Sequence, residues 1–287
     1  MLNLNVIIIP VYKSTLSEFE LISLNRCLKI LCNHDICLIT IKELELCLIL
    51  DVFKKHNIVP YLELFENTYF EGIYGYNRLM LSFDFYDRFK RYKYMLIYQL
   101  DAYVFRDELD YWCNQEYDYI GAPSPSEIKE IVKTKYKNDF DRDIDSNFSI
   151  YNGGLSLRKI NSFSKIIQEN KFYIDELLKK DWYEDVIFSK LLYEREEKLL
   201  PSNEMAVKFS FECFPSRLYL SNNRQLPMGC HAWYRNEGGI YDDWFWFKHI
   251  RPFYYYKLRF LEKLVFFRKK NIRRIKRILK HIFNYNA

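Results

Sequence analysis

YMLIYQLDAYVF, residues 94–105, is an apolar segment that contains one carboxylate, Asp101. A run without polar alternation is typical of a central strand that helices cover on both faces. In sheets of this kind, ligands bind beyond the carboxyl ends of the strands. An aspartate at that end can hold a hard divalent cation in a cleft, or it can merely cap the following turn. The segment alone leaves both interpretations open.

Short apolar segments alternate with amphipathic ones along the chain. A first amphipathic helix is expected after an N-cap at Ser14 or Thr15. Alternation with short connections indicates an α/β fold with a mostly parallel sheet flanked by helices. The predicted strands are 5–9, 36–40, 58–65, 94–100, 118–121 and 150–158, and the predicted helices are 15–31, 42–56, 75–89, 162–168, 171–179 and 184–193. Residues 209–231 are expected to be irregular.

The composition is typical of a globular protein with a large core. The 287 residues are 49% hydrophobic and 18% aromatic, which excludes a disordered chain. The seven cysteines form no CxxC pair and no zinc spacing, so we expect reduced thiols in a cytosolic protein. The N-terminal MLNLNVIIIP lacks the pattern of a signal peptide, and no stretch has the roughly 20 apolar residues of a membrane span.

The charges divide the chain into a body, residues 1–250, and a basic tail, residues 251–287. The tail holds 12 Lys or Arg and one acidic residue, whereas the body has a net charge of −6. Within residues 271–283, apolar and basic side chains segregate to opposite helical faces, and an apolar patch next to Arg268-Lys269-Lys270 precedes them. This pattern is typical of helices that lie on anionic membranes, so residues 254–287 are expected to bind one. A partner protein is an alternative, but nucleic acid is not expected because the body lacks a binding motif.

Eight segments, taken in order, resemble one family. They are NVIIIPVYK (5–13), IYGYNRLMLSFDFY (73–86), YMLIYQLDAYVF, YDYIGAP (117–123), YNGGLSLRK (151–159), EDVIFS (184–189), FSFE (209–212) and PMGCHAW (227–233). The ordered set resembles the bacterial glycosyltransferase-like family catalogued as domain-of-unknown-function family 5672, which is similar to sugar-nucleotide transferases of the GT-A fold. The resemblance covers residues 5–250. It implies a Rossmann-like sheet, a nucleotide-sugar donor and usually a divalent metal.

The resemblance implies a metal site at Asp101 and His231. GT-A enzymes carry a DxD motif after a strand, and the matching triplet here is Gln99-Leu100-Asp101. Gln99 would then contact the ribose or base of the donor, and the missing carboxylate predicts weaker binding of Mg²⁺ or Mn²⁺. His231 resembles the C-terminal histidine that completes such sites, and an imidazole favours Mn²⁺. The alternative for His231 is a loop histidine held by backbone contacts.

The same resemblance assigns the donor pocket. Pro10 and Tyr12 would lie beneath the nucleotide base, with Tyr12 stacked on uracil. Arg78 would contact the diphosphate or the sugar, because amides at a helix start and a guanidinium favour anions. Its alternative is an ion pair with Asp84 or Asp87.

The stretch Asn152-Gly153-Gly154 would line the donor-sugar pocket, where glycines let the backbone approach a ligand. A plain β-bulge is the alternative.

Glu184 and Asp185 resemble the acidic pair below the acceptor in inverting GT-A enzymes. Asp185 would take the proton from the attacking hydroxyl. Its position at the start of a helix predicts a lowered pKa. The alternative is that Glu184 and Asp185 only stabilise the helix N-terminus and have no catalytic role. Trp182 and Trp233 are assigned to the acceptor site, Trp182 by stacking on a sugar. A run of acids, residues 139–145, is expected to be a solvated loop near the acceptor.

These assignments predict a hexosyltransferase that uses a nucleotide-sugar donor, UDP-linked, and a divalent metal. The acceptor would be a lipid-linked or oligosaccharide precursor of a cell-surface glycan such as lipopolysaccharide or capsule. The protein would work in the cytoplasm as a peripheral protein on the inner face of the cytoplasmic membrane. A metal-neutralised diphosphate leaves without protonation, so one carboxylate base suffices for transfer, whereas glycoside hydrolases need two opposed carboxyls. The alternative function is a non-catalytic glycan- or nucleotide-binding scaffold of a membrane-associated assembly complex.

Overall fold

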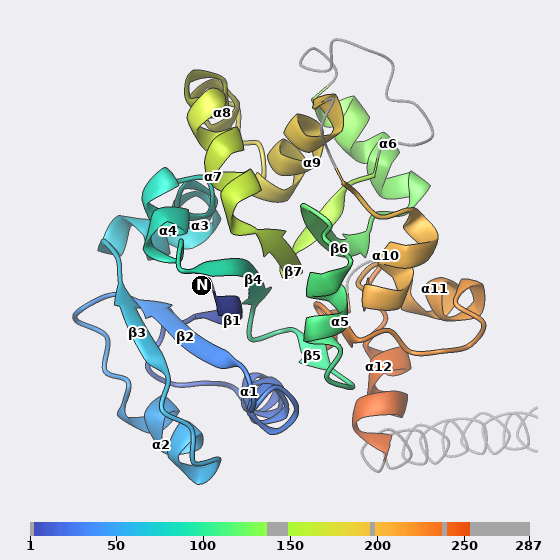
Figure 1. The fold of residues 1–287 in the computed structure, drawn as a ribbon. Coiled ribbons are helices and arrows are strands. Elements are labelled where there is room, and N and C mark those ends of the chain that lie inside the picture. The colour runs from blue at the N-terminus through green and yellow to red at the C-terminus, as the bar shows by residue number, and fades with distance from the viewer. Residues whose placement is uncertain (1–2, 137–148, 196–198, 237–239, 253–287) are drawn as a thin grey trace, which may run out of the picture.

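The computed structural model describes residues 3–136, 149–195, 199–236 and 240–252 (Figure 1). The acidic run 139–145 and the predicted membrane-binding segment 254–287 lie outside these residues.

A six-stranded sheet forms the centre of the molecule (Figure 1). Its strand order is β3-β2-β1-β4-β7-β6. The first four strands run parallel, and β7 runs antiparallel to both β4 and β6. The bounds are β1 (Asn3–Pro10), β2 (Asp35–Thr40), β3 (Tyr61–Leu64), β4 (Tyr92–Tyr98), β6 (Tyr119–Pro123) and β7 (Tyr151–Lys159). The predicted α/β fold with a mostly parallel sheet is therefore confirmed.

Helices cover both faces of this sheet (Figure 1). One face carries α7 with α4 beside it, and the other carries α1 and α5. The bounds are α1 (Glu18–Ile30), α2 (Cys47–Lys55), α3 (Gly72–Met80), α4 (Phe83–Arg88), α5 (Leu109–Asn114), α6 (Ser126–Lys135), α7 (Ile160–Glu169), α8 (Lys171–Lys179), α9 (Glu184–Glu194), α10 (Asn203–Phe209), α11 (Pro215–Ser221) and α12 (Asp243–Ile250), with a 3-10 turn η1 at Asn67–Phe70.

Two serine caps change the predicted helix boundaries. The first helix is capped by Ser17, in a capping box with Glu20, and not by Ser14 or Thr15. The predicted single helix 75–89 is two helices, because Ser82 ends α3 and caps α4. Its hydroxyl donates to the Leu79 carbonyl at 2.9 Å and accepts from the Phe85 amide at 3.2 Å. A serine that satisfies backbone groups in this way competes with a continuous helix.

A second sheet joins three segments that are far apart in the sequence. Its order is β5-β9-β8, with β5 (Tyr103–Val104), β8 (Ser210–Phe211) and β9 (Gly229–Cys230). The predicted irregular region 209–231 thus contributes two strands and α11. The backbone amide of His231 donates to the Phe211 carbonyl at 3.0 Å, and that of Trp233 donates to the Asp101 carbonyl at 3.3 Å. This sheet places the ends of β8 and β9 beside the turn that follows β4.

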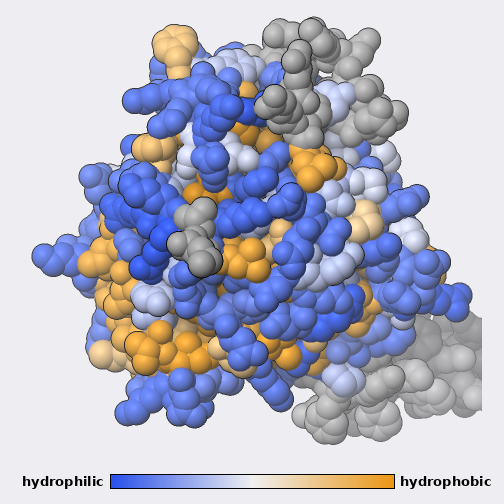
Figure 2. Space-filling view, in the orientation of Figure 1, coloured by the Kyte–Doolittle hydropathy of each residue, from blue (hydrophilic) through white to orange (hydrophobic). Residues whose placement is uncertain are grey.

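The strands β1 and β4 lie in the main core, where Val6–Ile9 and Tyr94–Tyr98 are fully buried. Such complete burial explains why these strands show no polar alternation. The visible face is largely hydrophilic, with apolar side chains gathered at the lower left over β3 (Figure 2). Val59, Leu62 and Leu64 are exposed there. Within the described residues, no helix has the length and apolar character that crossing a membrane requires.

Candidate functional site

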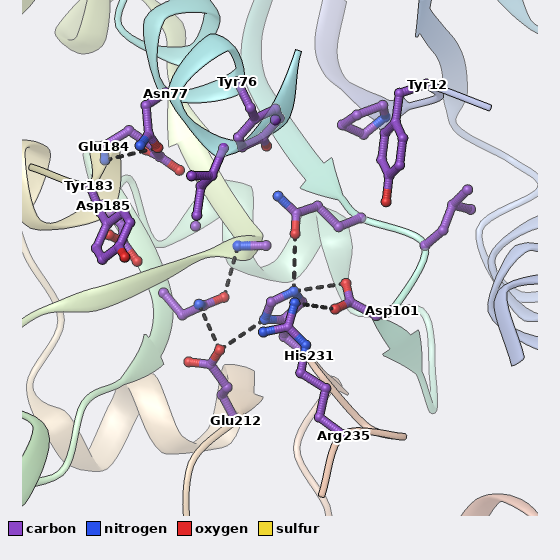
Figure 3. Close-up of a pocket in the computed structure, with 18 of the residues that line it drawn as sticks. Tyr12, Tyr76, Asn77, Asp101, Tyr183, Glu184, Asp185, Glu212, His231 and Arg235 are labelled. Atoms are coloured by element: carbon purple, nitrogen blue, oxygen red, sulfur yellow. Dashed lines mark hydrogen bonds and ion pairs between the residues drawn. The ribbon is translucent and has the colours of Figure 1, made fainter. Parts of the chain in front are cut away.

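A cavity of about 720 Å³ opens beyond the carboxyl ends of β1 and β4 (Figure 3). This is the position that ligands occupy in open α/β sheets. The start of β7, helices α3 and α9, and the segments after β8 and β9 complete its walls. Of the predicted site residues, the cavity is lined by Pro10, Tyr12, Gln99, Asp101, Asn152, Gly153, Gly154, Glu184, Asp185 and His231.

Asp101 and His231 meet in the middle of this cavity (Figure 3). Asp101 Oδ1 lies 2.9 Å from His231 Nε2, and Gln99 Oε1 lies 3.1 Å from the same nitrogen. A tight turn after β4, closed by the Ala102 amide on the Gln99 carbonyl at 2.9 Å, carries Asp101 to this place. The chain turns sharply after His231, where Ala232 has a left-handed φ of 53°.

Glu212, which sequence analysis did not single out, holds the other side of the imidazole. Its Oε1 lies 3.0 Å from His231 Nδ1 and accepts a hydrogen bond from Asn152 Nδ2 at 2.9 Å. The Asn152 Oδ1 in turn accepts from the Gly154 amide at 2.8 Å. Burial alone would lower the pKa of His231, but Asp101 and Glu212 raise it to about 10. The two carboxylates therefore favour the protonated imidazole, and a metal ion at Nε2 would take the place of that proton.

The charges around Asp101 keep its carboxylate ionised. Burial would raise the pKa of Asp101, but His231 and then Arg235 outweigh it and the pKa is lowered. Arg235 Nη2 lies 3.3 Å from Asp101 Oδ2. Arg235 was also not predicted, because it lies in a stretch without regular structure where a lone arginine carries no pattern.

Both glycines of the Asn152-Gly153-Gly154 stretch are required by close contacts. A Cβ on Gly154 would lie 2.1 Å from His231 Nε2, and one on Gly153 would lie 2.1 Å from Glu184 Oε1. The pairing of β6 with β7 also breaks here, since Gly121 pairs with Ser156 and Pro123 pairs with Tyr151. The stretch is therefore both an irregularity of the strand and a wall of the cavity.

Glu184 is a buried carboxylate with one free oxygen. Its Oε1 pairs with the fully buried Arg158 at 2.9 Å, and Arg158 also donates to the Tyr86 hydroxyl at 3.0 Å. Its Oε2 is buried without a hydrogen-bond partner among the described residues. The ion pair with Arg158 compensates the burial of this carboxylate, and Oε2 itself is enclosed by protein and does not face the cavity.

Asp185 lies at the opposite end of the cavity from Tyr12 (Figure 3). It is in the first turn of α9, where its Oδ1 accepts from the Val186 amide at 2.8 Å. Burial, followed by the nearby Glu184 and Glu212 carboxylates, raises its pKa to about 7. The predicted lowering by the helix start is therefore wrong, because desolvation and like charge outweigh the helix dipole.

Three predicted site residues do not line the cavity. Trp182 is fully buried against Tyr136, with ring centroids 4.1 Å apart. Trp233 is fully buried too, and its Nε1 donates to Ser23 Oγ at 2.8 Å. Neither indole has a face free for an acceptor sugar, so both acceptor assignments are corrected.

The assignment of Arg78 is corrected as well. Its guanidinium is exposed and lies 5.5 Å from the centre of the Tyr69 ring. The alternative ion pairs are absent, since Asp84 pairs with Arg88 and Asp87 with Lys90.

The donor set of this cavity fits a divalent cation that shares its coordination with a substrate. Within residues 3–136, 149–195, 199–236 and 240–252, no group of three or more His, Cys, Asp or Glu is placed to hold a metal. His231 Nε2, Asp101 Oδ1 and Gln99 Oε1 nevertheless converge, and Glu212 on Nδ1 supplies the outer carboxylate that metal-binding histidines usually have. Two protein ligands suffice for Mg²⁺ or Mn²⁺ when a diphosphate provides further oxygens.

Comparisons with known proteins identify the family and the fold of the chain. A family model described as "Protein of unknown function (DUF5672)" matches residues 61–231. The galactosyltransferase LgtC, in complex with donor and acceptor sugar analogs, superposes with a TM-score of 0.54 at 12% identity, over 85% of this chain and 95% of that one. An active-site mutant of LgtC gives 0.53 at 11% identity, over 82% and 92% of the two chains.

A third structure, the core-mannan synthase CmsA of Aspergillus fumigatus in its Mn/GDP form, gives a TM-score of 0.46 at 12% identity, over 66% of this chain and 69% of that one. None of the curated proteins compared with the chain matches it. The likeness to LgtC shows that the chain has the Rossmann-like GT-A fold.

Proposed function

The chain belongs to the family described as Protein of unknown function (DUF5672), and on that premise we propose that it is a glycosyltransferase. The reaction is the transfer of a hexose from a nucleotide-sugar donor, UDP-linked, to a glycan acceptor. The GT-A fold that the chain shares with LgtC supports this reaction class.

One observation carries the proposal. Asp101 and His231, which are far apart in the sequence, meet at 2.9 Å, and the cavity extends to Asp185, a carboxyl group with a pKa of about 7 (Figure 3). A cation-binding pair at one point and a base at another are the two parts that a nucleotide-dependent transfer needs.

The donor extends along the cavity from Tyr12 to Glu184. The nucleotide base stacks on Tyr12 above Pro10, and the diphosphate lies beside Arg235, whose charge favours an anion. Asp101 and His231 would hold a Mn²⁺ or Mg²⁺ ion, which would neutralise charge on the leaving diphosphate. The hexose lies against Asn152 and Gly153.

Asp185 acts as the general base. As the bond between the anomeric carbon and the diphosphate oxygen breaks, an acceptor hydroxyl attacks that carbon from the opposite face and its proton passes to the Asp185 carboxylate. This gives inversion at the anomeric carbon. A base with a pKa near 7 is ionised in about half of the molecules at neutral pH and is still a competent proton acceptor.

The acceptor is proposed to be a lipid-linked or oligosaccharide precursor of a cell-surface glycan. This rests on the basic, amphipathic pattern of residues 254–287, which suits the anionic inner face of the cytoplasmic membrane. The protein would therefore work as a peripheral membrane enzyme in the cytoplasm.

A non-catalytic binding scaffold is the second candidate. Gln99, in the place of an acid, lies 3.1 Å from the imidazole and removes one metal-binding charge. Release of nucleoside diphosphate from a panel of nucleotide sugars separates the two candidates. We expect turnover with a UDP-sugar, a loss of at least 100-fold in Asp101→Asn and in Asp185→Asn, and no loss in Asp87→Asn, on the exposed side of α4. Tight nucleotide binding without turnover of any donor would support the scaffold instead, and equal turnover in all variants would contradict the site.

A further inference from the structure

The end of the cavity opposite Asp185 is built like a slot for a flat ring. Pro10, Tyr12, Leu100 and Tyr234 line it, and the Tyr12 side chain is 58% exposed. Aromatic and apolar faces of this kind bind nucleobases by stacking, but stacking is tolerant of the base. A preference for one base therefore needs a polar group at the edge of the slot.

Glu20 is the carboxylate at this end. It lines the cavity from the first turn of α1, and its side chain is only 6% exposed. It lies near both tyrosines, since its charge raises the pKa of Tyr12 and of Tyr234 after the larger effect of burial. Asp101 also acts on both tyrosines but is paired with His231 and Arg235, so Glu20 is the carboxylate available to the base.

The contacts of Glu20 use a single oxygen. Its Oε2 accepts from the Ser17 amide at 2.8 Å and lies 2.8 Å from Lys13 Nζ. Its Oε1 makes no hydrogen bond with the residues that the structure describes. The capping box and the lysine therefore hold the carboxylate in place and leave one acceptor for a ligand.

We propose that Glu20 determines which nucleotide base the donor carries, by accepting the ring N–H of uracil or guanine through Oε1. This deepens the proposed function and rests on it. Uracil N3 and guanine N1 carry a hydrogen, whereas cytosine N3 and adenine N1 are acceptors. An ionised carboxylate can only accept hydrogen bonds, so it cannot form one with the ring nitrogen of cytosine or adenine, which carries a lone pair. A site that binds an N–H in this way rejects analogues that lack it.

The test is nucleotide binding by calorimetry in the presence of Mn²⁺, with UDP, GDP, CDP and ADP. We expect UDP or GDP to bind at least 10-fold more tightly than CDP and ADP. In Glu20→Gln the amide can donate to cytosine N3, so the ratio of the UDP and CDP dissociation constants should fall to about 3 or less. Glutamine also serves in a capping box, so the variant should fold.

Glu18→Gln is the matched control, because Glu18 lies in the same turn of α1 with its side chain 68% exposed, paired with Arg251. It should leave the preference unchanged. Equal binding of all four nucleotides, or an unchanged preference in Glu20→Gln, would overturn the role of Glu20 while leaving the transferase proposal standing. Failure of every nucleotide to bind would overturn both.

Discussion

Asp185 combines access to the cavity with a pKa of about 7, and this makes its ionisation visible in the reaction rate. Because only the carboxylate form accepts a proton, kcat/KM should rise about 10-fold per pH unit below pH 7 and level off above it. Asp185→Asn should lower kcat by about 10²–10⁴-fold without weakening UDP binding. A pH–rate profile with a UDP-sugar checks both. A flat profile between pH 5 and 8 would contradict the assignment of Asp185 as the base.

The same residue should cost the protein stability. Its folded-state pKa is raised above the ordinary value of 3.8, so the folded protein binds this proton more tightly than the unfolded chain does. The free energy of unfolding therefore falls as pH rises from about 4 to about 7, and the loss is complete above pH 7. Asp185→Asn removes the ionisation and should stabilise the protein by roughly 1–3 kcal/mol at pH 8, with a smaller gain at pH 5.

Thermal unfolding at the two pH values measures this difference. Asp175→Asn, at an exposed position of α8, is the control and should show no pH-dependent gain. If Asp185→Asn is instead less stable than the unchanged protein at pH 8, the favourable contacts of the Asp185 carboxylate outweigh its burial and the repulsion by nearby carboxylates.

Single residues were predictable where a motif surrounds them. Asp101, at the end of an apolar strand, and His231, in PMGCHAW, do converge, as the resemblance implied. Glu212 contacts His231, and Arg235 contacts Asp101. Glu212 ends the FSFE segment but received no role from it, and Arg235 lies in an irregular segment, where a charged side chain looks like any surface charge. Trp182 and Trp233 were misassigned because a tryptophan beside a motif can equally well pack in the core or bind a sugar. Only its burial in the structure distinguishes the two roles.

At the scale of elements, β7 depends on the absence of a side chain at Gly154. A methyl group there would lie 2.1 Å from His231 Nε2, so Gly154→Ala should push the imidazole away from Asp101. We expect Mn²⁺ affinity in the presence of UDP to fall about 10–100-fold and stability to fall by about 1–3 kcal/mol.

A double-mutant cycle with His231→Ala measures the energy of the contact between the new methyl group at position 154 and the His231 ring. Removing the ring should relieve the strain, so Gly154→Ala in the His231→Ala background should cost clearly less stability than it does alone. Fully additive losses would show that the methyl group collides elsewhere.

The periodicity of apolar residues predicts the helices and strands that are long enough to show a repeat. The strands of the six-stranded sheet and helices such as α8 lie close to their predicted bounds, because burial on one or both faces leaves a pattern in the residues themselves. The strands β5, β8 and β9 have two residues each, too few for any pattern, and they exist only through pairing with distant segments. The break at Ser82 was missed because apolar residues keep helical spacing across it.

At the scale of the whole molecule, the chain divides by charge. Residues 251–287 carry a net charge of +11 against −6 for the rest. Deletion of residues 254–287 should abolish flotation with vesicles that contain anionic lipid and leave turnover of a soluble acceptor within about 2-fold, because the cavity is formed by other residues. Vesicles of neutral lipid are the control. Equal flotation of the full and shortened chains would contradict a membrane role for the tail.

The β5-β9-β8 sheet also determines when a newly made chain can first bind a nucleotide. Gln99 and His231 are 132 positions apart, so at roughly 5–20 residues per second the ribosome needs on the order of ten seconds to deliver the second half of the pocket after the first. During that interval β5 has no partner, and the growing chain presents an open strand edge to chaperones or to its neighbours on a polysome. Nucleotide binding therefore becomes possible only after residue 231 has been synthesised.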